Sequence, residues 1–346
     1  MRWACRAADA APVERLFGDG DFPAGRAMLV PTPYRPPAQA ASAAFPLLLM
    51  TGRVRDQWHT MTRTGKTPRL LAHVPEPFLA LNLADAGDIP DGGLVVVQAP
   101  SGHAVLRARH DPGLRPGTLF APMHWTDRFC PAGRINPAVN AATDPVSGQP
   151  ELKHTPVRIR PFPARWHGFV LARRALGTGL AAWCAIRPPV GGVWRHELAG
   201  EDGPVAAGLR LRTLCTDIPG WMTLDDPARG VFRAVLLRFG HLQACVFLRP
   251  DHRLPARDWL QEAFAHDVMP AEIRHALLAG APAGGQSADP PICVCHGIGA
   301  QAIGDAIVAG FADVAAVGRA TRAGTNCGSC RPEIAALLAA RVTVAA

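Results

Sequence analysis

ICVCHGIG (residues 292–299) and GTNCGSCRPE (residues 324–333) place two cysteine pairs near the end of this chain. The first stretch holds a C-x-C pair and the second a C-x-x-C pair: Cys293, Cys295, Cys327 and Cys330. Thiolates are the ligands that soft metals and iron–sulfur clusters select. Paired cysteines in a cytosolic chain more often bind metal or do redox chemistry than form disulfides. The four cysteines therefore predict a metal or cluster site.

Two kinds of centre use four thiolates, and the residues alone leave both open. A zinc ribbon usually presents two C-x-x-C knuckles, whereas the first pair here is the tighter C-x-C, so a [2Fe–2S] centre is favoured over zinc. Two disulfides are disfavoured because the chain begins without a signal-peptide pattern. The remaining cysteines match no ligand spacing and are expected to be small buried apolar residues: Cys5, Cys130, Cys184, Cys215 and Cys245.

The sequence between and after the cysteines predicts a small helical domain over residues 292–346. Residues 299–309 and 313–320 are expected to form two short helices, with Gly310 as the stop between them. Pro332 suits the first turn of a further helix, whose free N–H groups would offset the negative charge of a cluster.

These stretches resemble the bacterioferritin-associated ferredoxin-like [2Fe–2S] domain. The likeness rests on the C-x-C pair, a spacer of about thirty residues, and the C-x-x-C pair followed by Pro-Glu. The resemblance implies that all four cysteines are ligands of one [2Fe–2S] cluster.

Length and composition set the bounds for the rest of the chain. Its 346 residues suffice for two or three domains. No apolar run approaches the roughly 18–20 residues of a membrane span, and the longest, Phe45–Met50, suits a buried strand. We therefore expect a cytoplasmic protein without a membrane partner. The formal charge of +8 comes from scattered basic residues with no run of five, so nucleic-acid binding is disfavoured.

The chain before residue 45 is expected to be a connector and the remnant of a preceding domain. Prolines at positions 31, 33, 36 and 37 interrupt it, and only Arg26–Val30 is a strand candidate.

Residues 45–160 predict a small β-barrel. Six short apolar runs are bounded by Gly, Pro or Asp, and few helix signals separate them. The strand candidates are Phe45–Thr51, Phe78–Leu83, Leu94–Ala99, Ala104–Arg109, Thr118–Pro122 and Thr155–Ile159.

Residues 161–280 predict a small α+β domain without a chemical signature. Residues 231–248 are typical of a hairpin turning at Gly240-His241, and Ala256–His266 and Pro270–Ala279 are expected to be helices. Residues 281–291, rich in Gly, Pro and Ala, are expected to be a flexible linker.

A basic segment, TGRVRDQWHTMTRTGK at residues 51–66, follows the first strand candidate. Its Arg, His, Lys and hydroxyl groups together with two glycines would suit a phosphate-bearing ligand. A solvated loop with chance basic residues is the alternative, and composition does not decide between them.

Three stretches, residues 51–78, 121–140 and 142–159, resemble the molybdopterin-dinucleotide-binding domain of assimilatory nitrate reductases, in the dimethyl-sulfoxide-reductase superfamily. Domain order extends the resemblance over essentially the whole chain. It implies a multidomain chain: a β-rich double-psi barrel, a small α+β domain and a small helical [2Fe–2S] domain.

The resemblance also implies a cofactor site for molybdopterin guanine dinucleotide. The matching positions are Gly52, Arg53, His59, Thr60, Thr62, Arg63, Asn136 and Lys153. Arg and Lys suit pyrophosphate, and Asn and Thr suit pterin or guanine edges. For His59 a hydrogen-bonded, partly buried structural role is the alternative.

A whole enzyme of this family also carries an N-terminal [4Fe–4S] motif and the domains around molybdenum, which these 346 residues lack. We therefore expect the C-terminal part of a nitrate reductase, as a truncated product, a split subunit or a fragment, with no catalytic residue of its own. Its electron donor would be a flavoprotein NAD(P)H reductase, a ferredoxin or a flavodoxin. The alternatives are a stand-alone electron-transfer and cofactor-binding protein and, more distantly, a regulatory module with structural zinc.

Overall fold

The structure, a computed structural model, describes residues 22, 25–31, 33–216, 218–282 and 291–344. The chain divides into two units, residues 1–38 and residues 39–346. In the described part of the first unit no strand is formed, so the prediction of a strand at Arg26–Val30 is wrong. Leu29 is 92% exposed, and its neighbours are exposed too. An extended segment becomes a strand only when another strand satisfies its backbone, and residues 26–30 pair with none of the described strands.

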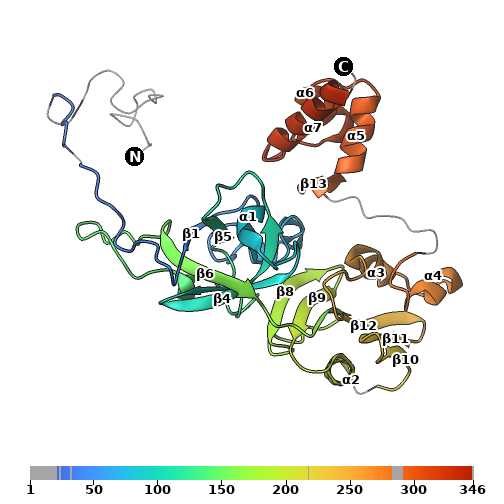
Figure 1. Cartoon of the computed structure of the whole chain (residues 1–346). Coiled ribbons are helices and arrows are strands. Elements are labelled where there is room, and N and C mark those ends of the chain that lie inside the picture. Colours follow the sequence, from blue (N-terminus) through green and yellow to red (C-terminus); the bar gives the residue numbers. More distant parts are fainter. Residues whose placement is uncertain (1–21, 23–24, 32, 217, 283–290, 345–346) are drawn as a thin grey trace. The chain divides into compact units, whose positions relative to one another are not determined.

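Six strands in the second unit close into a barrel, as the sequence predicted (Figure 1). Their order around the barrel is β1-β5-β2-β4-β3-β6. The strands are β1 Leu47–Gly52, β2 Phe78–Leu81, β3 Leu94–Ala99, β4 Gly102–His110, β5 Thr118–Pro122 and β6 Thr155–Pro161. Short helical turns lie between them: η1 Thr64–Lys66, η2 Pro68–Leu71, α1 Leu83–Ala86 and η3 Asn136–Ala138. Alternate side chains such as Leu49, Val95 and Leu119 fill the barrel core.

Strand directions bring distant segments to one end of the barrel. β5 runs parallel to β1, so both strands end there, at Gly52 and Pro122. β6 is antiparallel to β1 and begins there. β3 is antiparallel to β6, so it ends there. β4 is antiparallel to β3 and therefore begins there. β2 is parallel to β4, so it begins there too. We call this the motif end; residues 53–77, 100–101 and 123–154 form it.

An antiparallel six-stranded sheet follows the barrel, in the order β10-β11-β12-β7-β9-β8. Its strands are β7 Trp166–Ala172, β8 Trp183–Val190, β9 Val193–Gly200, β10 Trp221–Asp226, β11 Val231–Arg238 and β12 His241–Arg249. The helices are α2 Pro204–Cys215, α3 Arg257–Ala263 and α4 Ala271–Ala276. The predicted hairpin is confirmed: it turns at Phe239 and Gly240, which have φ values of +51° and +82°.

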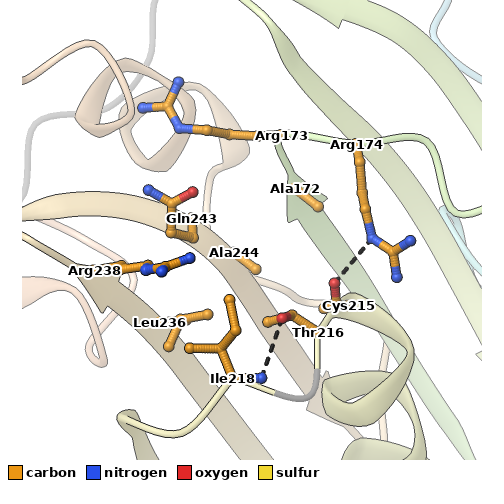
Figure 2. Close-up of a pocket in the computed structure, with 10 residues that line it drawn as sticks. All are labelled: Ala172, Arg173, Arg174, Cys215, Thr216, Ile218, Leu236, Arg238, Gln243 and Ala244. Atoms are coloured by element: carbon orange, nitrogen blue, oxygen red, sulfur yellow. Dashed lines mark hydrogen bonds between the residues drawn. The ribbon is translucent and has the colours of Figure 1, made fainter.

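A cavity of about 380 Å³ opens where β7, β11, β12 and the end of α2 meet (Figure 2). Two of its arginines serve the backbone: Arg174 Nε donates to Cys215 O at 3.0 Å, and Arg173 Nε donates to Leu242 O at 3.0 Å. Arg174 thereby caps the last carbonyls of α2, and a cation is favourable there. These contacts explain two of the three arginines that line the cavity as part of the fold.

A buried carboxylate joins the sheet to α3. Glu197 on β9 accepts hydrogen bonds from Arg195 Nε at 2.6 Å and from Arg257 Nη2 at 2.5 Å. Burial alone would raise the pKa of Glu197, but the two guanidinium groups outweigh it and hold the pKa well below its usual range. Glu197 is therefore ionised and paired.

The barrel and the sheet share one apolar cluster. Trp183 on β8 packs with barrel residues, and its indole Nε1 donates to Val105 O at 3.0 Å. The guanidinium of Arg107 lies 4.9 Å from the Trp183 ring centroid. This shared core fixes the sheet beside β4.

Two buried histidines are expected to make stability depend on pH. Burial lowers the pKa of His167 and of His196 from 6.5 to about 4, and His196 Nε2 accepts the Leu176 N–H at 3.3 Å, which requires a neutral ring. Because the unfolded chain takes up these protons near pH 6.5 and the folded chain only near pH 4, stability is fully present above that window and falls as the pH drops through it. The expected loss by pH 4 is roughly 3 kcal/mol for each histidine.

Urea unfolding at several pH values across this window measures the loss. The His196→Gln variant should show a shallower dependence, because one of the two rings no longer titrates. An unfolding free energy that stays constant between pH 7 and pH 4 would contradict the prediction.

The C-terminal segment forms a small helical structure. A short antiparallel pair, β13 Pro291–Cys293 and β14 Ile298–Gly299, precedes the helices α5 Ala300–Val308, α6 Val314–Thr321 and α7 Arg331–Val344. Asp313 caps α6 by accepting the Ala316 N–H at 2.7 Å, and Gly310 follows α5 with a φ of +96°, as its predicted role as a stop requires. Most of the predicted linker, residues 283–290, lies outside the described residues. Among the described helices, none is long and apolar enough to span a bilayer.

Candidate cofactor and cluster site

The four cysteines of the two C-terminal stretches form two close pairs. The Sγ atoms of Cys295 and Cys327 lie 3.2 Å apart. Burial and a hydrogen bond with Cys293 raise the pKa of Cys330 to about 11, so these two thiols are also in contact. Each pair takes one cysteine from each stretch. Cys293 and Cys330 are buried, and Cys327 is exposed.

Left-handed glycines shape the loop that carries the second cysteine pair. Gly324 and Gly328 have φ values of +75° and +74°, which other residues rarely adopt. Arg331 Nε donates to Gly324 O at 2.9 Å and holds the loop against the start of α7. Cys330 directly precedes α7, whose N-terminal end carries the positive end of the helix dipole and stabilises negative charge.

This arrangement of thiols fits a two-iron cluster. A [2Fe–2S] centre takes two ligands on each iron, whereas zinc takes four ligands around one point. The thiols lie as two pairs. Of the two centres that the sequence left open, the pairs match the [2Fe–2S] cluster.

At the motif end of the barrel, the third stretch meets the first. Lys153 Nζ donates to the carbonyl of Thr51, and it lies 3.6 Å from the place where a Cβ on Gly52 would sit. The Thr51 hydroxyl donates to Leu152 O at 2.8 Å. Lys153 is thereby fixed beside the residues that lead into Arg53.

The second stretch is tied to the first by His124, which the sequence analysis did not single out. Its Nε2 accepts the Val54 N–H at 3.0 Å, and its Nδ1 donates to His59 O at 2.5 Å. This pattern requires a neutral ring protonated at Nδ1. Burial lowers the pKa of His124 and keeps the ring neutral. The sequence signal for this residue was a histidine inside the quoted stretch 121–140. Its role could not be predicted, because its partners lie about 65–70 positions away.

Backbone strain is concentrated in the loop after β1. Asp56, His59 and Met61 have φ values of +71°, +43° and +60°, and only two other described non-glycine residues have a positive φ. Such conformations cost free energy, persist where surrounding contacts impose them, and cluster at functional sites. Here Met61 is buried in the core shared with the sheet, and His124 holds the His59 carbonyl.

All eight predicted cofactor positions lie at the motif end or at the strand terminus that enters it. Gly52 is buried, and the other seven are exposed: Arg53, His59, Thr60, Thr62, Arg63, Asn136 and Lys153. The ring of His59 lies beside Trp58, with centroids 4.9 Å apart. Asn136 begins η3, which Ser101 joins to the β3–β4 turn by donating to Ala138 O at 3.1 Å. The segment that carries Asn136 is far from the first stretch in sequence, but it lies at the same end of the barrel.

One buried amide at the motif end lacks a partner. Gln57 Oε1 accepts the Thr64 hydroxyl at 2.8 Å, but Gln57 Nε2 is buried and finds no acceptor among the described residues. Buried donors are nearly always satisfied in folded proteins. An acceptor from a bound molecule would complete this group, which fits a polar cofactor at this end.

Another asparagine in the second stretch is structural. Asn140 is buried, its Nδ2 donates to His154 O at 2.7 Å, and its Oδ1 accepts the Ala142 N–H at 2.8 Å. It closes the segment that carries Lys153 against the start of β6.

Comparisons with known proteins agree with this geometry. The family model described as "Molydopterin dinucleotide binding domain" matches residues 47–156, and the one described as "BFD-like [2Fe-2S] binding domain" matches residues 291–340. The nitrate reductase of Klebsiella oxytoca is 36% identical over 331 residues, which is 93% of this chain and 37% of that protein. The chain is a nitrate reductase homologue.

Two further relatives of this nitrate reductase homologue differ in type. The periplasmic nitrate reductase of Desulfovibrio desulfuricans is 37% identical over 42% of this chain and 19% of its own length. The assimilatory nitrate reductase catalytic subunit of Bacillus subtilis is 32% identical over 47% of this chain and 23% of its own length. The homologue thus spans between about a fifth and two fifths of these relatives.

The predicted resemblance to the C-terminal part of a nitrate reductase is confirmed. The homologue has a molybdopterin-dinucleotide-binding domain, which includes the barrel strands up to the start of β6, and a [2Fe–2S]-binding domain that includes all four paired cysteines.

Proposed function

We propose that this chain is the C-terminal part of an assimilatory nitrate reductase, which reduces nitrate to nitrite. In this proposal the motif end binds molybdopterin guanine dinucleotide and the paired cysteines hold a [2Fe–2S] cluster that relays electrons toward molybdenum. The observation that carries it is the match of one chain to both domain families together with its similarity to nitrate reductases over 93% of its length. The name of the Bacillus subtilis relative supports the assimilatory role.

The chain's own residues would bind and position the cofactor. Lys153 and Arg53 would pair with phosphate oxygens, because ammonium and guanidinium groups form charge-assisted hydrogen bonds with them. Gln57 Nε2 would donate to an acceptor atom of the ligand. His124 would keep the first and second stretches in register. In this proposal these groups bind and position the cofactor and take no part in bond making or breaking.

Each bound group would supply its own chemistry. The cluster carries one electron at a time, and the molybdenum cofactor supplies the two-electron, two-proton conversion of nitrate into nitrite and water. We propose a flavoprotein NAD(P)H reductase, a ferredoxin or a flavodoxin as the donor, and a cytoplasmic location. Any part that surrounds the metal would come from elsewhere in the complete enzyme.

Replacing Lys153 with alanine is expected to weaken cofactor binding by roughly 1.5–3 kcal/mol, the range for a hydrogen bond to a charged group. This corresponds to a dissociation constant about ten to 150 times larger. Titration of the purified chain with molybdopterin guanine dinucleotide measures it. Arg160→Ala is the matched control, because Arg160 is an exposed cation nearer the other end of β6. Equal affinities of the Lys153→Ala variant and the unaltered chain would refute the assigned site.

A further inference from the structure

One side chain of the barrel makes an unusual number of contacts with the C-terminal segment. Arg55, in the strained loop after β1, reaches this segment through two guanidinium nitrogens. Its Nη1 donates to Ser329 O at 3.3 Å and to Glu333 Oε1 at 2.5 Å, and its Nη2 donates to Ile292 O at 3.2 Å. These three partners lie 237 to 278 positions further along the chain.

The partners of Arg55 surround the paired cysteines. Ile292 precedes Cys293, and Ser329 lies between Cys327 and Cys330. Glu333 lies in the first turn of α7, where a carboxylate is favourable. One guanidinium therefore binds both cysteine-bearing loops at once.

A second arginine repeats this contact. Arg69, in η2 of the same motif-end segment, donates through Nη1 to Cys295 O at 3.1 Å. Both arginines address backbone carbonyls of the cysteine loops, which a guanidinium reaches with several donors in one plane. These hydrogen bonds therefore depend on the backbone conformation of the loops that place the thiols.

Local contacts hold Arg55 in this position. Its Nε donates to Asp56 Oδ2 at 3.1 Å, and its Nη2 lies 3.1 Å from His73 Nε2. Burial would raise the pKa of Asp56, but the hydrogen bonds from His73 and Arg55 outweigh it and lower that pKa, so the carboxylate stays charged. The Arg55 side chain is 18% exposed, and Asp56 is 6% exposed. Such burial strengthens the hydrogen bonds relative to a surface pair.

We infer that Arg55 is the positioning residue that seats the cysteine loops on the motif end of the barrel. If the proposed function holds, this seat places the cluster-binding loops next to the segment that grips the molybdenum cofactor. This seat, the set of hydrogen bonds from Arg55 to the cysteine loops, is formed by residues of this chain alone. It requires neither the cluster nor the molybdenum cofactor to be bound. A purely local role, bracing Asp56 and His73 within the loop, is the competing explanation.

Hydrogen exchange of the full chain, followed by mass spectrometry of its peptides, separates the two explanations. In the Arg55→Ala variant we expect at least tenfold faster exchange both in residues 55–73 and in residues 291–299. Arg134→Ala is the matched control: Arg134 pairs with Asp127 at 2.8 Å at the same end of the barrel. In the described part of the chain neither residue forms a hydrogen bond or ion pair with the cysteine loops, so exchange should stay unchanged. The conservative Arg55→Lys variant should keep part of the protection in both segments, because its ammonium group still donates hydrogen bonds.

Two results would overturn the inference. One is unchanged exchange in Arg55→Ala, and the other is acceleration confined to residues 55–73, which marks a local brace. Iron content and cofactor affinity are measured on the same preparations. If the chain binds neither cluster nor cofactor yet exchange behaves as expected, the proposed function fails and the seat stands. If both groups bind and exchange is unaffected, the seat fails and the function stands.

Discussion

Replacing Cys330 with serine is expected to remove the [2Fe–2S] centre completely while the barrel stays folded. Cys330 is 3% exposed and lies against Cys293, so the loss of its thiolate leaves one iron with an incomplete ligand set in a site closed to other ligands. The barrel strands belong to a separate apolar cluster, which keeps its packing. Iron and acid-labile sulfide per chain, with the visible absorption, measure the loss, and circular dichroism reports the fold.

The Cys215→Ser variant is the control for this experiment. Cys215 is also buried, and burial raises the pKa of its thiol to about 12, but it lies at the end of α2, far along the chain from the cysteine pairs. It should retain two irons and two sulfides. A Cys330→Ser chain that keeps its visible absorption, or an unaltered chain prepared without oxygen that holds one zinc and no iron, would contradict the assignment.

Replacing Glu197 with alanine is expected to lower the free energy of unfolding by about 3–5 kcal/mol, the usual effect of breaking a buried ion pair. The substitution leaves Arg195 and Arg257 charged and without their shared carboxylate, and it separates β9 from α3. Urea unfolding at neutral pH, followed by tryptophan fluorescence, gives the difference. Glu201→Ala is the matched control, since Glu201 is exposed near the end of β9 and should change stability by less than about 0.5 kcal/mol. A loss below about 1 kcal/mol for Glu197→Ala would show that the charges are compensated elsewhere.

The barrel could be predicted from sequence because its strands are short, apolar and separated by turn residues. Leu94–Ala99 and Thr118–Pro122 have the predicted bounds, and the other four strands differ by one or two residues at one or both ends. Closure of these strands into one barrel is confirmed. The fold-family detail of a double-psi connection stays a prediction.

The sheet was predicted only in part: the hairpin of β11 and β12 was expected, whereas β7, β8, β9 and β10 were not. β8 contains Pro188 and Pro189, which cannot donate to a ladder and are unusual inside a strand. In the structure the register with β9 shifts between Arg187 and Val190, so the two prolines occupy an irregularity on the edge strand of the sheet. Such an interruption of pairing depends on the partner strand and leaves no local signal.

The residues of the candidate site were also predicted only in part. The four paired cysteines and Lys153 belong to motifs that can be recognised from local sequence. Arg55 and His124 instead matter through partners about 65 to 278 positions away. Arg55 stood in the quoted stretch as one basic residue among several. Only the folded chain distinguishes the arginine that contacts the cysteine loops from its exposed neighbour Arg53.

The placement of all motif segments at one end of the barrel leaves the opposite end available for attachment. The loop from Asp111 to Gly117 joins β4 to β5 there, and Pro112, Gly113 and Arg115 are exposed. Exposed loop tips of this kind tolerate insertions. A short tag placed between Pro112 and Gly113 would tether the chain to an electrode surface with the cofactor segments directed away from it, so that the orientation of immobilised protein is set by the barrel itself.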